Sequence, residues 1–121
     1  MIAICPSNDL INGGRGVRFE VSVAGRAVPA FVVRFGGVAR AYLNRCAHVS
    51  MELDWQPGEF FDFDAEHLLC ATHGALYDPA SGRCVGGACV GFGHLRALAI
   101  VERNGSVYWI PDEYAQAPGA A

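Results

Sequence analysis

The chain is short, with 121 residues, so we expect one domain with a modest core. Hydrophobic residues make up 52% of it and charged residues 17%, with 15 Gly and 6 Pro, which indicates a globular and turn-rich protein. The net charge of −3 argues against the strongly basic surface of a nucleic-acid-binding protein. No apolar run approaches the roughly 20 residues that cross a bilayer, and residues 1–9 lack the features of a secretion signal. We therefore expect no nucleic-acid partner, no membrane span and a cytoplasmic location.

The first third of the chain has the residue pattern of β-strands. Val, Phe and Tyr concentrate in segments that glycine-containing turns separate. The predicted strands are residues 2–5, 16–23, 26–35 and 38–44. In the second of these, charged residues such as Arg18 and Glu20 alternate with apolar ones. We therefore expect one face of the strand to be exposed to solvent and the other to be buried.

The alternation fades from residue 45 to about residue 93, which predicts an inserted lobe. Within it we expect short strands at 66–70 and 75–77, and a helical turn at 50–55. After the lobe, segments 95–102 and 106–110 flank an Asn-Gly turn and predict a hairpin that closes the main sheet. The fold class is therefore all-β. We expect a single domain over residues 1–112 and a flexible tail over residues 113–121.

Two short motifs in the lobe offer metal ligands. Cys46-Ala47-His48 is followed, after 21 residues, by Cys70-Ala71-Thr72-His73. Each motif supplies one thiol and one imidazole, whereas zinc sites usually pair Cys with Cys and His with His. The mixed pairs favour a two-iron centre, with Cys46 and Cys70 on one iron and His48 and His73 on the other. A structural zinc site, or no metal at all, remains the alternative.

The spacing Cys-x-His, 21 residues, Cys-x-x-His-Gly resembles the Rieske iron–sulfur motif. Tyr77-Asp78, a Ser81-Gly82 turn and a glycine-rich loop at 86–93 extend the resemblance to the soluble Rieske ferredoxins of the bacterial oxygenase-associated kind. It implies a Rieske fold: an antiparallel β-sandwich base with an inserted, smaller cluster-binding β lobe. It also implies one [2Fe-2S] cluster per chain, bound at the four Cys and His positions. Surrounding residues would be Gly74, Ala75, Tyr77, Gly87 and Ala88.

The ligand types have an electrostatic consequence. Two ferric ions, two sulfides and two thiolates sum to zero charge when the other ligands are neutral imidazoles, so adding an electron is easier than with four thiolates. Potentials of Rieske centres accordingly lie at about −150 to +300 mV.

Several positions depart from the pattern of the membrane-complex Rieske proteins. Those carry an extra Cys in each ligand loop, and here Met51 and Thr72 stand there, so no disulfide between the loops is expected. Ala75 replaces a serine that donates to a bridging sulfide, although Tyr77 is expected to donate to a ligand sulfur. Ala88 replaces the proline of the third loop. With fewer donors to sulfur, we expect a potential in the lower part of the range.

The resemblance implies a one-electron carrier between a reductase and an oxygenase-type acceptor, rather than a stand-alone enzyme. The alternative is a redox-sensing or structural Rieske subunit of a larger oxidoreductase complex. A terminal oxygenase is disfavoured because 121 residues leave no room for a mononuclear iron domain. A small subunit of the nitrite-reductase type, which often lacks ligands, is disfavoured because all four are present.

Charge is distributed unevenly. All nine basic residues are Arg, and the interval between Arg45 and Arg83 contains none, yet it holds seven of the 12 acids. They are Glu52, Asp54, Glu59, Asp62, Asp64, Glu66 and Asp78. We hypothesise that this acidic lobe steers docking onto basic surfaces of the redox partners.

The remaining Cys, His and aromatic residues are interpreted as structural. Cys84 and Cys89 are expected to be two semi-buried thiols rather than a bridge, because a reducing compartment is expected. Cys5 is expected in the core, and His67 and His94 outside the ligand set. The lobe's aromatic residues are expected mostly to pack beneath it; they are Trp55, Phe60, Phe61 and Phe63.

Overall fold

The computed structural model describes residues 1–47, 51–89 and 93–118. Its elements are β1 (Ile2–Pro6), the 3₁₀ turn η1 (Ser7–Asp9), β2 (Val17–Val23), β3 (Arg26–Phe35), β4 (Val38–Leu43), β5 (Leu68–Leu69), β6 (Leu76–Tyr77), β7 (Cys84–Gly86), the 3₁₀ turn η2 (Gly87–Cys89), β8 (Ala97–Leu98), β9 (Ile100–Arg103) and β10 (Ser106–Trp109). Among these residues no helix is long and apolar enough to span a membrane.

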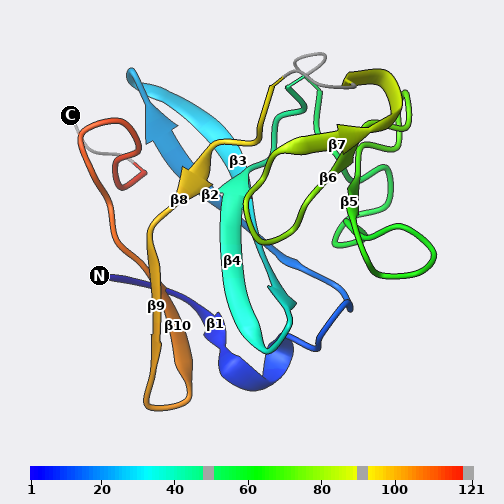
Figure 1. Ribbon diagram of the computed structural model, residues 1–121. Coiled ribbons are helices and arrows are strands. Elements are labelled where there is room, and N and C mark those ends of the chain that lie inside the picture. The colour runs from blue at the N-terminus through cyan, green and yellow to red at the C-terminus, as the bar shows by residue number, and fades with distance from the viewer. Residues whose placement is uncertain (48–50, 90–92, 119–121) are drawn as a thin grey trace.

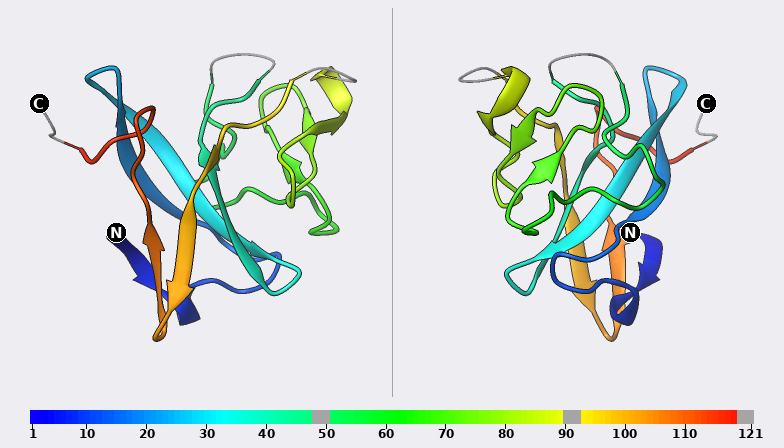
Figure 2. Two further views of the ribbon diagram at one scale, coloured as in Figure 1. Left: turned by 60° about the vertical axis from the view of Figure 1, so that its left-hand side comes forward. Right: turned by 90° about the vertical axis from the view of Figure 1, so that its right-hand side faces the viewer.

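The strands form three antiparallel sheets. A four-stranded sheet has the order β2-β3-β4-β8, and a three-stranded sheet has the order β1-β10-β9. These two make the base, and the third sheet, β5-β6-β7, forms a smaller lobe beside it (Figures 1 and 2). The predicted all-β base with an inserted small β lobe is confirmed.

Two predicted hairpins have tight turns with both central residues in the left-handed region. Asn104 and Gly105, with φ of 51° and 78°, join β9 to β10, and Ala24 and Gly25, also at 51° and 78°, join β2 to β3. Two consecutive positive φ values match the twist of paired strands, and Asn-Gly adopts them readily. The Asn-Gly signal in the sequence therefore predicts this hairpin correctly.

Strand β3 is buried on both faces and separates two apolar cores. Val28, Ala30 and Val32 contribute to the core of the base, while Phe31 and Val33 contribute to the core beneath the lobe. Because side chains alternate across a strand, one continuous apolar run serves both sides. The lobe thus packs onto the base through β3.

Two polar contacts fasten these layers. Arg34 on β3 donates to both carboxylate oxygens of Glu102 on β9, at 3.0 and 2.6 Å, and the hydrogen bond from Arg34 lowers the pKa of Glu102 to about 2. The Tyr42 hydroxyl donates to the carbonyl of Pro79 in the β6–β7 turn at 2.7 Å, and burial raises the pKa of Tyr42 to about 12. The first contact joins the two base sheets, and the second joins base and lobe.

The segment after the lobe differs from the prediction. The expected strand 95–102 is interrupted at Ala99: β8 pairs with β4, while β9 pairs with β10. The hairpin then pairs with β1 rather than with the main sheet, so the expectation that it closes that sheet is wrong. Within the described residues 51–55 there is no helical turn, and β7 has no counterpart among the predicted strands.

Part of the predicted tail packs on the base. Ser22 and Gln116 exchange two backbone hydrogen bonds of 2.8 Å, and Ala115 is fully buried. Arg96 lies 3.9 Å from the centre of the Tyr114 ring, which adds a cation–π contact. The chain from Asp112 to Gln116 is therefore held in place rather than frayed.

Candidate metal centre

Three loops meet at one end of the small lobe. In their described residues, the first follows β4 (44–47 and 51–59), the second joins β5 to β6 (70–75), and the third contains β7 and η2 (84–89 and 93–94). Ala71 of the second loop donates its backbone N–H to Leu53 of the first at 3.0 Å. A Cβ on Gly93 of the third loop would lie 2.9 Å from the Ala47 Cβ of the first. The second and third loops therefore both lie close to the first.

Gly87 fixes the third loop against the second. A Cβ built at this position would lie 2.0 Å from the carbonyl oxygen of Gly74 and 3.1 Å from the Ala75 Cα. Its φ is +71°, so both the space and the backbone conformation require glycine. Ala88, which follows within η2, is exposed. Three of the residues predicted to surround the cluster therefore lie together: Gly74, Ala75 and Gly87.

The second loop turns its two predicted ligands in different directions. Gly74 donates to the carbonyl of Cys70, and Cys70 donates to the carbonyl of Ala75, both at 2.9 Å. This tight hairpin end leaves the Cys70 side chain fully buried and His73 exposed. The sulfur faces the core of the lobe, and the imidazole faces outwards.

The first loop places Cys46 beside Cys70. Cys46 is only 3% exposed, and its backbone N–H donates to Met51 at 2.8 Å. Its side chain lies within hydrogen-bonding reach of the Cys70 thiol. Burial, reinforced by Cys46, raises the pKa of Cys70, while the backbone N–H groups of Thr72 and His73 oppose this shift. Two adjacent buried thiols with amide donors nearby suit a cation that binds thiolates.

Tyr77 provides a hydrogen bond to one of these sulfurs. Its hydroxyl oxygen lies 3.1 Å from the Cys46 Sγ and accepts the backbone N–H of Ala47 at 2.9 Å. A thiolate has no proton to give, so the tyrosine hydroxyl donates to the sulfur of a deprotonated Cys46. The side chain is fully buried, which fixes this geometry.

Cys84 and Cys89 form a disulfide, so the expectation of two thiols is wrong. The 3₁₀ turn η2 folds the chain back after β7 and brings the two Cα atoms to 6.0 Å, within the range that a disulfide spans. Both sulfurs lie near the carbonyl of Gly86. In the sequence, the signal for this bridge is a pair of cysteines five residues apart around a Gly-Gly turn, whereas the expected reducing compartment favours free thiols.

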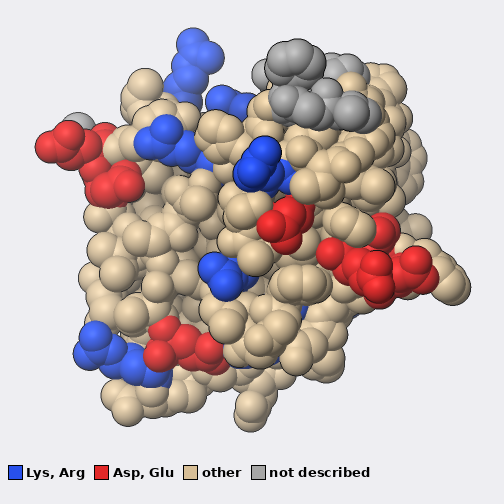
Figure 3. Space-filling model, in the orientation of Figure 1, with Lys and Arg blue, Asp and Glu red and all other residues tan. Residues whose placement is uncertain are grey.

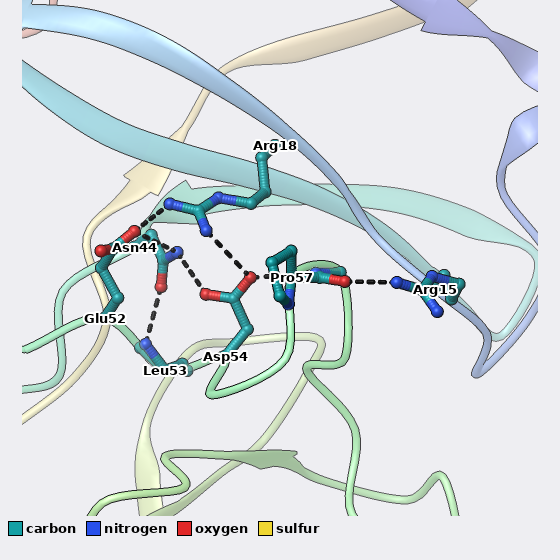
Figure 4. A network of polar contacts seen from close by, with 8 residues as sticks. Arg15, Arg18, Asn44, Glu52, Leu53, Asp54 and Pro57 are labelled. Atoms are coloured by element: carbon teal, nitrogen blue, oxygen red, sulfur yellow. Dashed lines mark hydrogen bonds and ion pairs between the residues drawn. The ribbon is translucent and has the colours of Figure 1, made fainter.

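The acidic residues are not all free surface charges. Asp54 is buried: it accepts Asn44 Nδ2 at 2.8 Å and Gly58 N at 3.0 Å, and lies 3.5 Å from Arg18 (Figure 4). Glu52 is paired with the same Arg18. The absence of bases within the lobe sequence is thus partly offset by an Arg from β2.

Four acidic residues gather on one side of the lobe, and three of them, Glu59, Asp64 and Glu66, are exposed. Figure 3 shows them over the loop that precedes β5, which contains Glu59, Asp62, Asp64 and Glu66. Asp62 lies 3.3 Å from the half-buried ring of His67, and Glu59 lies 3.7 Å from Arg15. This group flanks the lobe.

The other expectations have mixed outcomes. Cys5 lies in the core of the base, as predicted, and His94 is exposed in a bridge with Arg83. Phe60 is buried and Phe61 half-buried, but Trp55 and Phe63 are 84% and 102% exposed, so packing is the wrong interpretation for these two. Nothing in their sequence environment separates them from the buried pair.

His48 and its neighbours at 49–50 lie outside the described residues, as do residues 90–92 of the third loop. Within the rest of the chain no three potential ligands form a group that could already hold an ion. Of the predicted set, Cys46 and Cys70 lie buried beside each other, and His73 is exposed in the same loop as Cys70.

The described structure is an all-β domain with a small β lobe in which two loops place a pair of buried thiols side by side. Residues 1–98 match the Rieske [2Fe-2S] domain family, and the chain belongs to this family. Membership implies one [2Fe-2S] cluster per chain. The described residues fit such a cluster. Cys46 and Cys70 are a buried thiol pair, the Tyr77 hydroxyl lies within hydrogen-bonding distance of the Cys46 sulfur, and Gly87 packs on Gly74 of the second loop.

Solved structures share the fold. The ferredoxin of carbazole 1,9a-dioxygenase from Nocardioides aromaticivorans IC177 has a TM-score of 0.70 and 23% identity, over 92% of this chain and 97% of that one. A complex of reduced oxygenase and oxidised ferredoxin in carbazole 1,9a-dioxygenase matches with a TM-score of 0.66 and 21% identity. The match covers 90% of this chain and 100% of that one. The terminal oxygenase of carbazole 1,9a-dioxygenase from the same Nocardioides strain matches with a TM-score of 0.69 and 23% identity. This match covers 98% of this chain but only 34% of that one. The search of curated proteins found no significant match.

Proposed function

We propose that the chain is a one-electron carrier that takes electrons from a reductase and passes them to an oxygenase-type acceptor. The observation that carries this proposal is the arrangement of the second loop, where Cys70 is buried beside Cys46 and His73 is exposed. Cys46 and Cys70 would hold one iron of the cluster, and His48 and His73 the other. When bound, the cluster supplies reversible one-electron chemistry at a Rieske potential.

The protein's own residues set the conditions for that chemistry. The Tyr77 hydroxyl donates to the Cys46 sulfur and so favours the more negative, reduced state. Gly87 holds the third loop on the second, which restricts water at the buried sulfurs. His73, on the exposed side, offers a short route for an electron to a protein docked there. Ala75 is fully buried and has no donor, so we retain the proposal of a potential in the lower part of the Rieske range.

The matched structures support a carrier. The match covers 97% of the chain of a ferredoxin of carbazole 1,9a-dioxygenase, and the related complex contains a ferredoxin and an oxygenase. We also propose a cytoplasmic location, in which case the Cys84–Cys89 disulfide is one that persists against a reducing environment. The exposed acids on the flank of the lobe would attract basic partners at long range, an effect that salt screens.

A second candidate is a redox-sensing or structural subunit in a larger oxidoreductase. The same fold forms about a third of a terminal oxygenase chain, so a Rieske domain also works as a fixed part of an enzyme. Copurification with one large subunit would favour this role. Rapid turnover as a separate protein would favour the carrier.

The test is reconstitution. The purified, cluster-loaded protein is titrated anaerobically with a reductant and then mixed with a flavin-dependent reductase and a Rieske-type oxygenase, with oxygenase turnover as the readout. The proposal expects one electron per chain, reversibly, and turnover that depends on this protein. A cluster that cannot be reduced and reoxidised would contradict it.

A further inference from the structure

An open groove lies beside both cysteine loops. It has a volume of about 370 Å³ and is lined by Met51, Glu52, Asp54, Trp55 and Thr72. Met51 accepts the backbone N–H of Cys46, and Thr72 stands between Cys70 and His73 in the sequence. A group seated in this groove therefore contacts both loops that carry the predicted ligands.

The groove presents a large apolar side chain. Trp55 is 84% exposed and Met51 is 49% exposed. An exposed Trp sacrifices the free energy that its burial would contribute, and Trp is among the residues most enriched at the energetic centres of protein interfaces. Trp55 and Met51 line the same groove among polar residues, and an exposed apolar patch with a polar rim is typical of a protein-interaction site.

The backbone around Trp55 is held firmly. Leu53, two residues earlier, is fully buried and donates its N–H to Asn44 Oδ1 at 2.8 Å. Asp54 is fixed by the Gly58 N–H and, as Figure 4 shows, by Asn44 and Arg18. Because the residues before Trp55 are locked on the core, its exposure is a feature of the fold. The buried polar network positions the indole outwards beside the cysteine loops.

Charge narrows the choice of occupant. Two carboxylates, Glu52 and Asp54, share the single guanidinium of Arg18, which leaves one negative charge at the groove. No Lys or Arg is among the described residues that line it. A complementary surface combines an apolar recess for the indole with a rim of basic side chains.

We propose that Trp55 and its groove are the docking anchor for a redox-partner protein whose electron-transfer site is apolar at its centre and ringed by Lys or Arg. This inference rests on the proposed carrier function and names the surface that would hold the partner beside the electron's route, because Thr72, which lines the groove, immediately precedes His73. Docking there puts the partner against Met51 and Thr72, next to the loops of Cys46 and Cys70.

Cytochrome c is a suitable probe, because its exposed haem edge is ringed by lysines. The reduced, cluster-loaded protein is mixed with ferricytochrome c in a stopped-flow instrument at low salt, for wild type, Trp55→Ala and Trp55→Phe. Phe63→Ala is the matched control, since Phe63 is an aromatic residue that is 102% exposed in the loop preceding β5 and does not line the groove. Tris(phenanthroline)cobalt(III), a small oxidant that needs no docking surface, is tested in parallel, and each potential is measured.

The expected result is a second-order rate with cytochrome c about tenfold lower for Trp55→Ala, as for truncation of an interface anchor. Trp55→Phe recovers part of the rate, Phe63→Ala keeps it, and neither the cobalt rates nor the potentials change. Equal cytochrome c rates for Trp55→Ala and wild type, or equal losses for Trp55→Ala and Phe63→Ala, would overturn the docking proposal while leaving the carrier intact. A wild-type protein that reduces neither oxidant would instead overturn the carrier function, and the docking inference with it.

Discussion

Replacing Tyr77 by Phe removes one hydroxyl and should lower the reduction potential. That hydroxyl lies 3.1 Å from the Cys46 sulfur and accepts the Ala47 N–H at 2.9 Å. A hydrogen bond to a charged group contributes about 1.5–3 kcal/mol. The sulfur is negative in both redox states, so only part of this, about 1 kcal/mol, distinguishes the reduced from the oxidised form. Since 59 mV corresponds to about 1.4 kcal/mol for one electron, we expect a fall of about 40 mV.

The assay is a spectroelectrochemical titration of both proteins at the same pH, with iron content measured on each sample. Ala75→Ser is the companion variant. It adds a hydroxyl at a fully buried position next to the second loop and should raise the potential. A Tyr77→Phe protein with a full complement of iron and an unchanged or higher potential would refute the role assigned to the hydroxyl.

Three further changes test the structure around the centre. The double variant Cys84→Ala/Cys89→Ala should have a free energy of unfolding about 2 kcal/mol lower than wild type, because the disulfide restricts a short loop of the unfolded chain. Urea denaturation without reductant measures this difference. Alkylation of both thiols in the unreduced wild type would contradict the bridge. Gly87→Ala would place a Cβ 2.0 Å from a carbonyl of the second loop, so iron should be lost to a chelator several times faster, and an unchanged rate would count against the loop contact. Glu102→Gln should destabilise the protein at pH 7, because the hydrogen bond from Arg34 lowers the pKa of Glu102 from 4.5 to about 2. With solvent screening of this partly exposed pair included, the expected loss is about 1–2 kcal/mol. This stability is present above pH 4.5 and disappears as the pH falls to about 2, so the urea midpoints of the two proteins should converge over that window; a constant difference would exclude the ion pair as its cause.

Most strands follow from local patterns, whereas their partners do not. The segments 26–35 and 38–44 have clear apolar periodicity and tight turns, and both strands form almost as predicted. The segment 95–102 also has strand character, yet it divides between two sheets at Ala99. Which sheet receives a strand depends on contacts distant in sequence, here with β4 and β1, and periodicity carries no information about them.

The centre shows the same division. Ligand spacing and the family resemblance were enough to expect Cys46, Cys70 and Tyr77 together, because these residues carry the chemistry themselves. The sequence does not predict the Arg18 contact with Asp54, because Arg18 lies on β2, far from the lobe in sequence. Trp55 is exposed while Phe60 is fully buried, and only the folded chain distinguishes these two aromatic residues.

The most direct test of the central claim is the content and redox capacity of the protein as purified without oxygen. Iron, acid-labile sulfide and zinc are measured per chain, and the same sample is titrated with a one-electron reductant. A Rieske carrier should contain two iron ions and two sulfides per chain and take up one electron reversibly. One zinc per chain, with no sulfide and no redox activity, would contradict the account.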